Sequence, residues 1–208
     1  MLQTYLLGLI IGLTGALVPG PTLVATINSS AREGWSTGPR ISAGHALVEA
    51  CIFLLIILGI GSVNAVQEYT ALIAAIGGIA LLIFGLLTIR GAKDALPDGK
   101  AEAVVANPYL AGALTSISNP YFWMWWLTVG SALVLAAASQ AFFFAIAFLV
   151  GHWSADFGWY TVVSTSIHQG RKIMDDRIYT WILRGCGVFL LIFGVYYLGT
   201  ALAWILQG

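Results

Sequence analysis

Six long apolar runs, separated by short polar segments, constrain this 208-residue chain more than any other feature. Each run is long enough to cross a bilayer, because a transmembrane helix needs about 20 mostly apolar residues. Only 9% of the residues are charged, whereas a soluble domain carries about 25%. We therefore predict an all-α integral membrane protein with six transmembrane helices, at about 4–27, 37–61, 69–90, 107–137, 140–167 and 179–206.

The connections between these runs are too short to hold a soluble domain. We predict one membrane domain over residues 1–208, with a first half at 1–90, a cytoplasmic linker at 91–106 and a second half at 107–208. The first run has no basic segment before it and no good cleavage site, so we interpret it as a retained helix rather than a signal peptide.

The charges predict the orientation of these helices. The nine basic residues lie in or beside the first, third and fifth connections, and the second and fourth connections have none. Basic loops stay in the cytoplasm, so we predict a multi-pass protein of the plasma membrane with both termini outside. The net charge is zero, so the chain has no excess of basic residues that would favour nucleic-acid binding. The basic residues are Arg32, Arg40, Arg90, Lys93, Lys100, Arg171, Lys172, Arg177 and Arg184.

Two of the nine acidic residues, Glu49 and Asp156, fall inside predicted spans. Each follows a histidine by four positions, His45 and His152, and a glycine precedes each histidine. Residues four apart share one face of a helix, so each histidine can reach its acid. A carboxylate at the bilayer centre costs about 2.5–3.5 kcal/mol. We therefore predict that these four side chains face the interior and bind the substrate or an ion, the alternative being a polar pair that only joins helices.

Prolines predict breaks in the first and fourth helices. Pro19-Gly20-Pro21 interrupts the first run, and Asn119-Pro120 interrupts the fourth, because proline lacks an N–H and clashes with the preceding turn. Unpaired backbone at membrane depth survives only where it lines a cavity. The new helix starts carry partial positive charge, which suits an anion such as an amino-acid carboxylate. The alternative is a pair of structural proline kinks.

These elements also indicate an internal repeat. Gly-Ala-Leu begins at Gly15 and again at Gly112, 97 positions later, and the Gly-His-x-x-x-acid segments begin at Gly44 and Gly151. Each half holds three helices, an odd number, so the second copy enters the membrane upside down. We predict a 3+3 inverted repeat, the architecture of secondary transporters that bind substrate near the midplane, between the repeats.

A tryptophan-rich stretch follows the break in the fourth helix. We include Trp123 among the candidate substrate-contacting residues, because an aromatic ring inside a span can wall a pocket for an apolar or cationic group. The alternative is that this stretch packs against neighbouring helices.

The combination of Pro-Gly-Pro at 19–21, Gly34, Gly38 and Gly44 ahead of Glu49, and Asn119-Pro120 resembles the lysine-exporter (LysE/RhtB) family over essentially the whole chain. The resemblance implies export of an amino acid or a related metabolite from the cytoplasm, driven by protons or another cation. It implies no cofactor and no enzymatic activity, and the residues contain no nucleophile–base set. The partners expected are the lipid bilayer, a small-molecule substrate and the coupling cation.

Other functions stay open at this point. Two imidazoles and two carboxylates also suit a divalent transition metal, so His45, Glu49, His152 and Asp156 would be the ligands in a metal-ion exporter. A membrane scaffold that transports nothing is the second alternative, and it predicts no polar cavity between the two Gly-His-x-x-x-acid segments. The sequence also leaves a homo-oligomer open.

Overall fold

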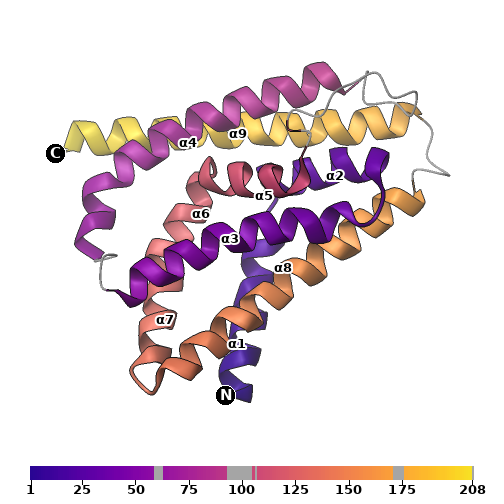
Figure 1. Ribbon diagram of the computed structural model, residues 1–208. Coiled ribbons are helices and arrows are strands. Elements are labelled where there is room, and N and C mark those ends of the chain that lie inside the picture. The colour runs from indigo at the N-terminus through magenta and orange to yellow at the C-terminus, as the bar shows by residue number, and fades with distance from the viewer. Residues whose placement is uncertain (59–62, 93–104, 106, 171–175, 208) are drawn as a thin grey trace.

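The computed structural model describes residues 1–58, 63–92, 105, 107–170 and 176–207, and these residues are almost entirely helical (Figure 1). The helices, in chain order, are α1 (Leu2–Ala16), α2 (Pro21–Glu33), α3 (Thr37–Ile57), α4 (Val63–Gly91), α5 (Pro108–Ile117), α6 (Pro120–Trp125), the π-helical segment η1 (Trp126–Gly130), α7 (Ser131–Ala138), α8 (Phe142–Gly170) and α9 (Asp176–Gln207).

The described helices confirm an all-α membrane protein. Five segments are long and apolar enough to span a bilayer, namely α3, α4, the continuous α6–η1–α7, α8 and α9. The bent pair α1–α2 provides up to one more. The fourth span begins at Pro120, later than predicted, because α5 forms a separate short helix before it.

Both predicted breaks are present. α1 and α2 meet at an angle of 79°, and α2 begins with Gly20 as an extended N-cap followed by Pro21. At the second break, the Asn119 side chain caps α6 by accepting the Tyr121 N–H at 3.1 Å. Proline follows the cap in both cases, where its missing N–H leaves no donor unpaired.

α3 and α5 approach closely because glycines face each other's backbones. A Cβ on Gly44 would lie 1.9 Å from the Tyr109 carbonyl oxygen of α5, and a Cβ on Gly112 would lie 2.0 Å from the Ile41 carbonyl oxygen of α3. Small residues allow this kind of backbone contact between membrane helices. Glycine is therefore required at both positions.

The same contact recurs between α1 and α8. A Cβ on Gly8 or on Gly151 would lie 2.1 Å from a backbone carbonyl oxygen of the facing helix. Gly8 precedes Gly112 by 104 positions, and Gly44 precedes Gly151 by 107. The first helix of each half thus packs on the second helix of the other half. By these contacts, a position in the first helix of the first half corresponds to the position 104 residues later in the second half. The Gly-Ala-Leu elements, in contrast, are 97 residues apart.

α4 and α9 form an outer pair that lies side by side along one edge of the molecule (Figure 1). Gly78 faces Gly194 and Gly85 faces Gly187, with glycine carbonyls 2.8–3.0 Å from where a Cβ would stand. The opposite faces of both helices expose large apolar side chains, as expected for contact with lipid.

Four of the nine basic residues lie outside the described residues. Most of the predicted linker 91–106, together with Lys93, Lys100, Arg171 and Lys172, lies outside the described residues. The predicted orientation and the predicted linker therefore stay predictions.

Candidate functional site

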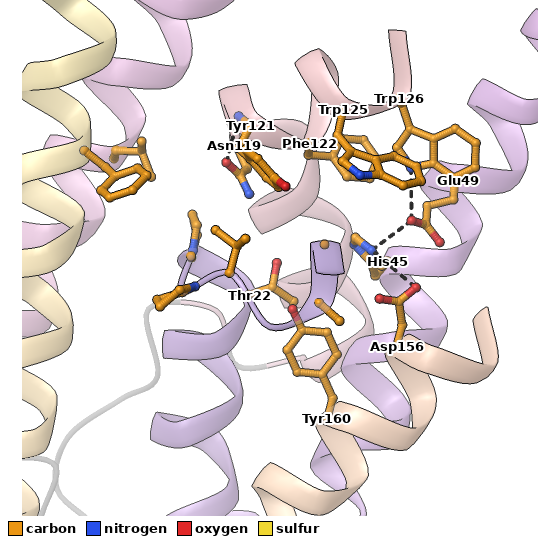
Figure 2. A pocket seen from close by; sticks show the side chains of 18 of the residues that line it. Thr22, His45, Glu49, Asn119, Tyr121, Phe122, Trp125, Trp126, Asp156 and Tyr160 are labelled. Atoms are coloured by element: carbon orange, nitrogen blue, oxygen red, sulfur yellow. Dashed lines mark hydrogen bonds and ion pairs between the residues drawn. The ribbon is translucent and has the colours of Figure 1, made fainter. Parts of the chain in front are cut away.

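A cavity of about 60 Å³ lies where the α1–α2 break meets α3, α6, α8 and α9 (Figure 2). Its walls combine a polar cluster with a band of aromatic rings, and they include the first turn of α2. No lysine or arginine lies among the described residues that line it. Eight of the predicted site residues line the cavity: Pro19, Gly20, Pro21, His45, Glu49, Asn119, His152 and Asp156.

The two predicted histidine–acid pairs meet in one buried cluster. The Nε2 atoms of His45 and His152 each lie 3.0 Å from the same oxygen, Oε1 of Glu49. Oδ2 of Asp156 lies 3.5 Å from His152 Nε2 and 4.0 Å from His45 Nε2. Glu49 is 1% exposed and Asp156 is 3% exposed. The cluster therefore joins the second helix of each half.

Close packing of α3 on α8 positions these four side chains. The Ser42 hydroxyl of α3 donates to the Asp156 backbone carbonyl of α8 at 3.3 Å. Gly38 of α3 lies directly against the Tyr160 carbonyl of α8. On α1, a Cβ at Gly12 would lie 2.9 Å from His152 Nδ1, so this glycine leaves room for the imidazole.

Ser116, which the sequence analysis missed, orients His45. The Ser116 Oγ lies 2.5 Å from His45 Nδ1 and 2.6 Å from the Gly112 carbonyl oxygen. A hydroxyl has one proton, so when it donates to Gly112 it accepts from Nδ1–H. Nε2 is then the nitrogen of His45 that can gain or lose a proton. Its 3.0 Å contact with Glu49 is attractive only if Nε2 carries a proton or a bound cation lies between the two atoms.

The tryptophans of the cavity differ from the predicted one. Trp126 donates its indole N–H to Glu49 Oε1 at 3.0 Å, and the Trp125 ring lies 4.7 Å from that of His152. Trp123 does not line the cavity, and its N–H donates to the Ile117 carbonyl at 2.7 Å. The tryptophan-rich stretch correctly indicated that this segment contributes to the cavity. Which of its tryptophans point inward depends on how the helix is rotated after the Asn119-Pro120 break.

Pro120 also lies outside the cavity lining. Its ring packs on α4, where a Cβ at Gly77 would lie 2.6 Å from it. Pro120 therefore contributes by breaking the helix and seating it on α4. Other lining residues that were not predicted from the sequence include Thr22, Tyr121, Phe122, Tyr160 and Phe193.

Several buried atoms of the cluster have no hydrogen-bond partner among the described residues. They are Oε2 of Glu49, Oδ2 of Asp156 and Nδ1 of His152. Burying a polar group without a partner costs free energy. Two carboxylate oxygens are thus available to a ligand with N–H donors or to a metal ion. One oxygen or nitrogen atom each from His45, Glu49 and Asp156 lies within 4.8 Å of the others, as a metal site requires.

Comparison with known proteins identifies relatives over most of the chain. The model of the LysE type translocator family matches residues 13–200. The chain is 31% identical over 124 residues to "Uncharacterized membrane protein PA4757" of Pseudomonas aeruginosa, a match that spans 56% of each chain. It is 21% identical over 203 residues to "Putative amino acid efflux protein YcgF" of Bacillus subtilis, covering 94% of this chain and 95% of that protein. No solved structure gives a significant match.

Proposed function

This chain belongs to the LysE type translocator family, and on that premise we propose that it exports an amino acid or a related small metabolite from the cytoplasm across the plasma membrane. The observation that carries the proposal is the meeting of both intramembrane acids, Glu49 and Asp156, at one cavity beside the α1–α2 break. The efflux function named for the Bacillus subtilis relative supports amino acids as the substrate class.

The polar groups of the cavity suit the two charged ends of an amino acid. Oε2 of Glu49 and Oδ2 of Asp156, which have no hydrogen-bond partner among the described residues, accept hydrogen bonds from the substrate ammonium group. The start of α2 at Pro21 and Thr22, which lines the same cavity, favours the carboxylate. The aromatic rings beside the cluster favour a cationic group and exclude water.

Coupling follows because the proton and the substrate bind the same carboxylate. A proton at the contact between His45 Nε2 and Glu49 Oε1 reduces the negative charge that Oε2 of Glu49 offers to the substrate ammonium group, so binding of one disfavours the other. Export of the substrate in exchange for a proton then needs only that the cavity opens to one side of the membrane at a time. The coupling cation in this proposal is H⁺.

We also propose the 3+3 inverted repeat with both termini outside. The reciprocal glycine contacts of α1 with α8 and of α3 with α5 support the repeat. The basic residues near the α2–α3 connection support the orientation.

The test is efflux from proteoliposomes loaded with each of the common amino acids in turn. Glu49→Gln and Asp156→Asn should abolish proton-coupled efflux of the exported amino acid. Glu33→Gln, at the exposed end of α2, is the matched control and should export normally. Wild-type protein that exports none of them would contradict the function, and full efflux by both cavity variants would contradict the assigned site.

A divalent-metal exporter is the second candidate, supported by the geometry of the cluster. Ligand atoms about 2.1 Å from a tetrahedral ion lie about 3.4 Å apart. One ligand atom each from His45, Glu49 and Asp156 lies within 4.8 Å of the others, and His45 Nε2 lies 3.0 and 4.0 Å from the two acids. Ser116 would hold His45 by its other ring nitrogen, as second-shell partners of metal ligands do.

Thermal stability in detergent tests the metal function. Zn²⁺ or Mn²⁺ should raise the unfolding temperature of the wild type and of His168→Ala, a histidine outside the cluster, and should not raise those of His45→Ala and His152→Ala. A wild type indifferent to both ions would exclude this candidate. The polar lining of the cavity argues against the scaffold alternative, which predicts no such cavity.

A further inference from the structure

A second cavity, of about 40 Å³, lies next to the first and is not used by the proposed site. α2, α4, α5 and α9 enclose it. It shares two lining residues, Pro21 and Leu190, with the central cavity, so the two cavities are consecutive along α2. A water needs about 10–15 Å³ of such space, so a group the size of an ammonium fits.

Three side-chain oxygens of this second cavity, on Asn28, Thr88 and Thr115, can accept a hydrogen bond. Thr88 donates its hydroxyl proton to the Phe84 carbonyl at 2.7 Å, and Thr115 donates to the Ala111 carbonyl at 2.7 Å. Each hydroxyl oxygen keeps lone pairs for another donor. Oδ1 of Asn28, on α2, is buried and has no partner. No described lining residue carries a charge. A ligand with N–H donors satisfies these three oxygens.

A hydrogen bond between two threonines separates the cavities. Thr22 lines the central cavity and Thr115 lines the second one, and their hydroxyl oxygens lie 3.1 Å apart. Since the Thr115 proton is directed to Ala111, Thr22 is the donor. The Tyr160 hydroxyl lies beside Thr22 on the central side (Figure 2). This contact is a small partition between two polar spaces.

We propose that the second cavity is an entry site that binds the ammonium group of the substrate before it reaches the central cavity, and that the Thr22–Thr115 contact separates the two sites. The proposal rests on the export function. α2 runs from the central cavity past Asn28 to Arg32 and Glu33, at the end that the basic residues place in the cytoplasm. An exported solute would therefore meet the second cavity first.

Transport kinetics provide the first test. Thr88→Val and Asn28→Leu should raise the internal concentration of the exported amino acid that gives half-maximal efflux, by about tenfold, as expected for the loss of one hydrogen bond to a charged group. Thr200→Val is the matched control, because its hydroxyl is exposed and donates to the Tyr196 carbonyl at 3.0 Å. Its half-saturating concentration should not change.

A second measurement needs no transport. Ala25→Cys, which places a thiol in the lining of the second cavity without removing a polar group, should react with a cationic methanethiosulfonate in a protein whose Cys51 and Cys186 are replaced. Methylammonium should slow this reaction, and acetate of similar size should not. Equal effects of the two ions, or none, would overturn the entry site, as would normal kinetics of Thr88→Val and Asn28→Leu in an exporting protein. A wild type that exports nothing would contradict the export function, while the labelling result would still decide whether the second cavity binds an ammonium group.

Discussion

At the scale of single residues, the two oxygens of Glu49 differ. Oε1 lies 3.0 Å from His45, His152 and the indole nitrogen of Trp126, whereas Oε2 has no hydrogen-bond partner among the described residues. Hydrogen bonds to an ionised group are the stronger ones. Oε1 is therefore fixed by the cluster, and Oε2 is the oxygen available to a ligand.

The Trp126 N–H is a donor whose loss can be tested separately. Trp126→Phe keeps an aromatic ring but removes the hydrogen bond to Glu49, which should cost about 1.5–3 kcal/mol if the carboxylate is charged. We expect at least tenfold weaker substrate binding with little change in the detergent-solubilised fold.

Trp123→Phe is the control for that experiment. It removes an indole N–H that donates to the Ile117 carbonyl, outside the cavity. Isothermal titration of both variants with the exported amino acid makes the comparison. Equal affinities would show that the hydrogen bond to Glu49 does not position the site.

The sequence allowed the four charged residues of the cluster to be predicted but not their neutral neighbours. Glu49 and Asp156 are conspicuous because an acid is costly in an apolar run, and the spacing of four identifies the histidines. Ser116 and Trp126 have no such signal, since serine and tryptophan are common in membrane helices. Their roles depend on the rotation of α5 and of the segment after the Asn119-Pro120 break, which only tertiary packing determines.

At the scale of helices, glycines set the distances that bring the cluster together. Gly44 and Gly151 immediately precede the two histidines, and each lies against a carbonyl of the facing helix. Gly44→Ala and Gly151→Ala should each separate a helix pair and destabilise the protein by on the order of 1–3 kcal/mol or more.

Gly158→Ala is the matched control for these glycines, because it lies in α8 with nothing within 4 Å of a Cβ. Thermal unfolding in detergent is the measurement. Gly158→Ala should unfold at or slightly above the wild-type temperature, since alanine favours a helix. Similar unfolding temperatures for all three variants would show that the close approaches are not required.

The lengths of the hydrophobic runs predicted which segments are helical, but they did not predict the directions in which the helices run. The run at 4–27 correctly predicted a broken helix, but the 79° angle between α1 and α2 comes from packing on α8 and α5. The run at 107–137 contains both α5 and a span that starts at Pro120. Hydropathy is continuous across Asn119, so it does not indicate that α5 stands apart.

At the scale of the whole molecule, the inverted repeat predicts opposite faces for two short connections. In a protein without Cys51 and Cys186, Ser36→Cys, between α2 and α3, should react with an impermeant maleimide only after the cells are permeabilised. Gln140→Cys, between α7 and α8, should react in intact cells. Labelling of both from the same side would contradict six spans, and the reverse pattern would contradict the orientation.

The shared oxygen of Glu49 has a thermodynamic consequence for the molecule. It ties α3 of one half to α8 of the other through His152, so a cation bound at Oε2 of the same carboxylate draws charge from Oε1 and weakens a bond between the halves. Linkage is reciprocal. A change in the relative position of the two halves must therefore alter the affinity of the Glu49 carboxylate for a cation by the same factor. Binding of one small cation can in this way change the arrangement of the whole helix bundle.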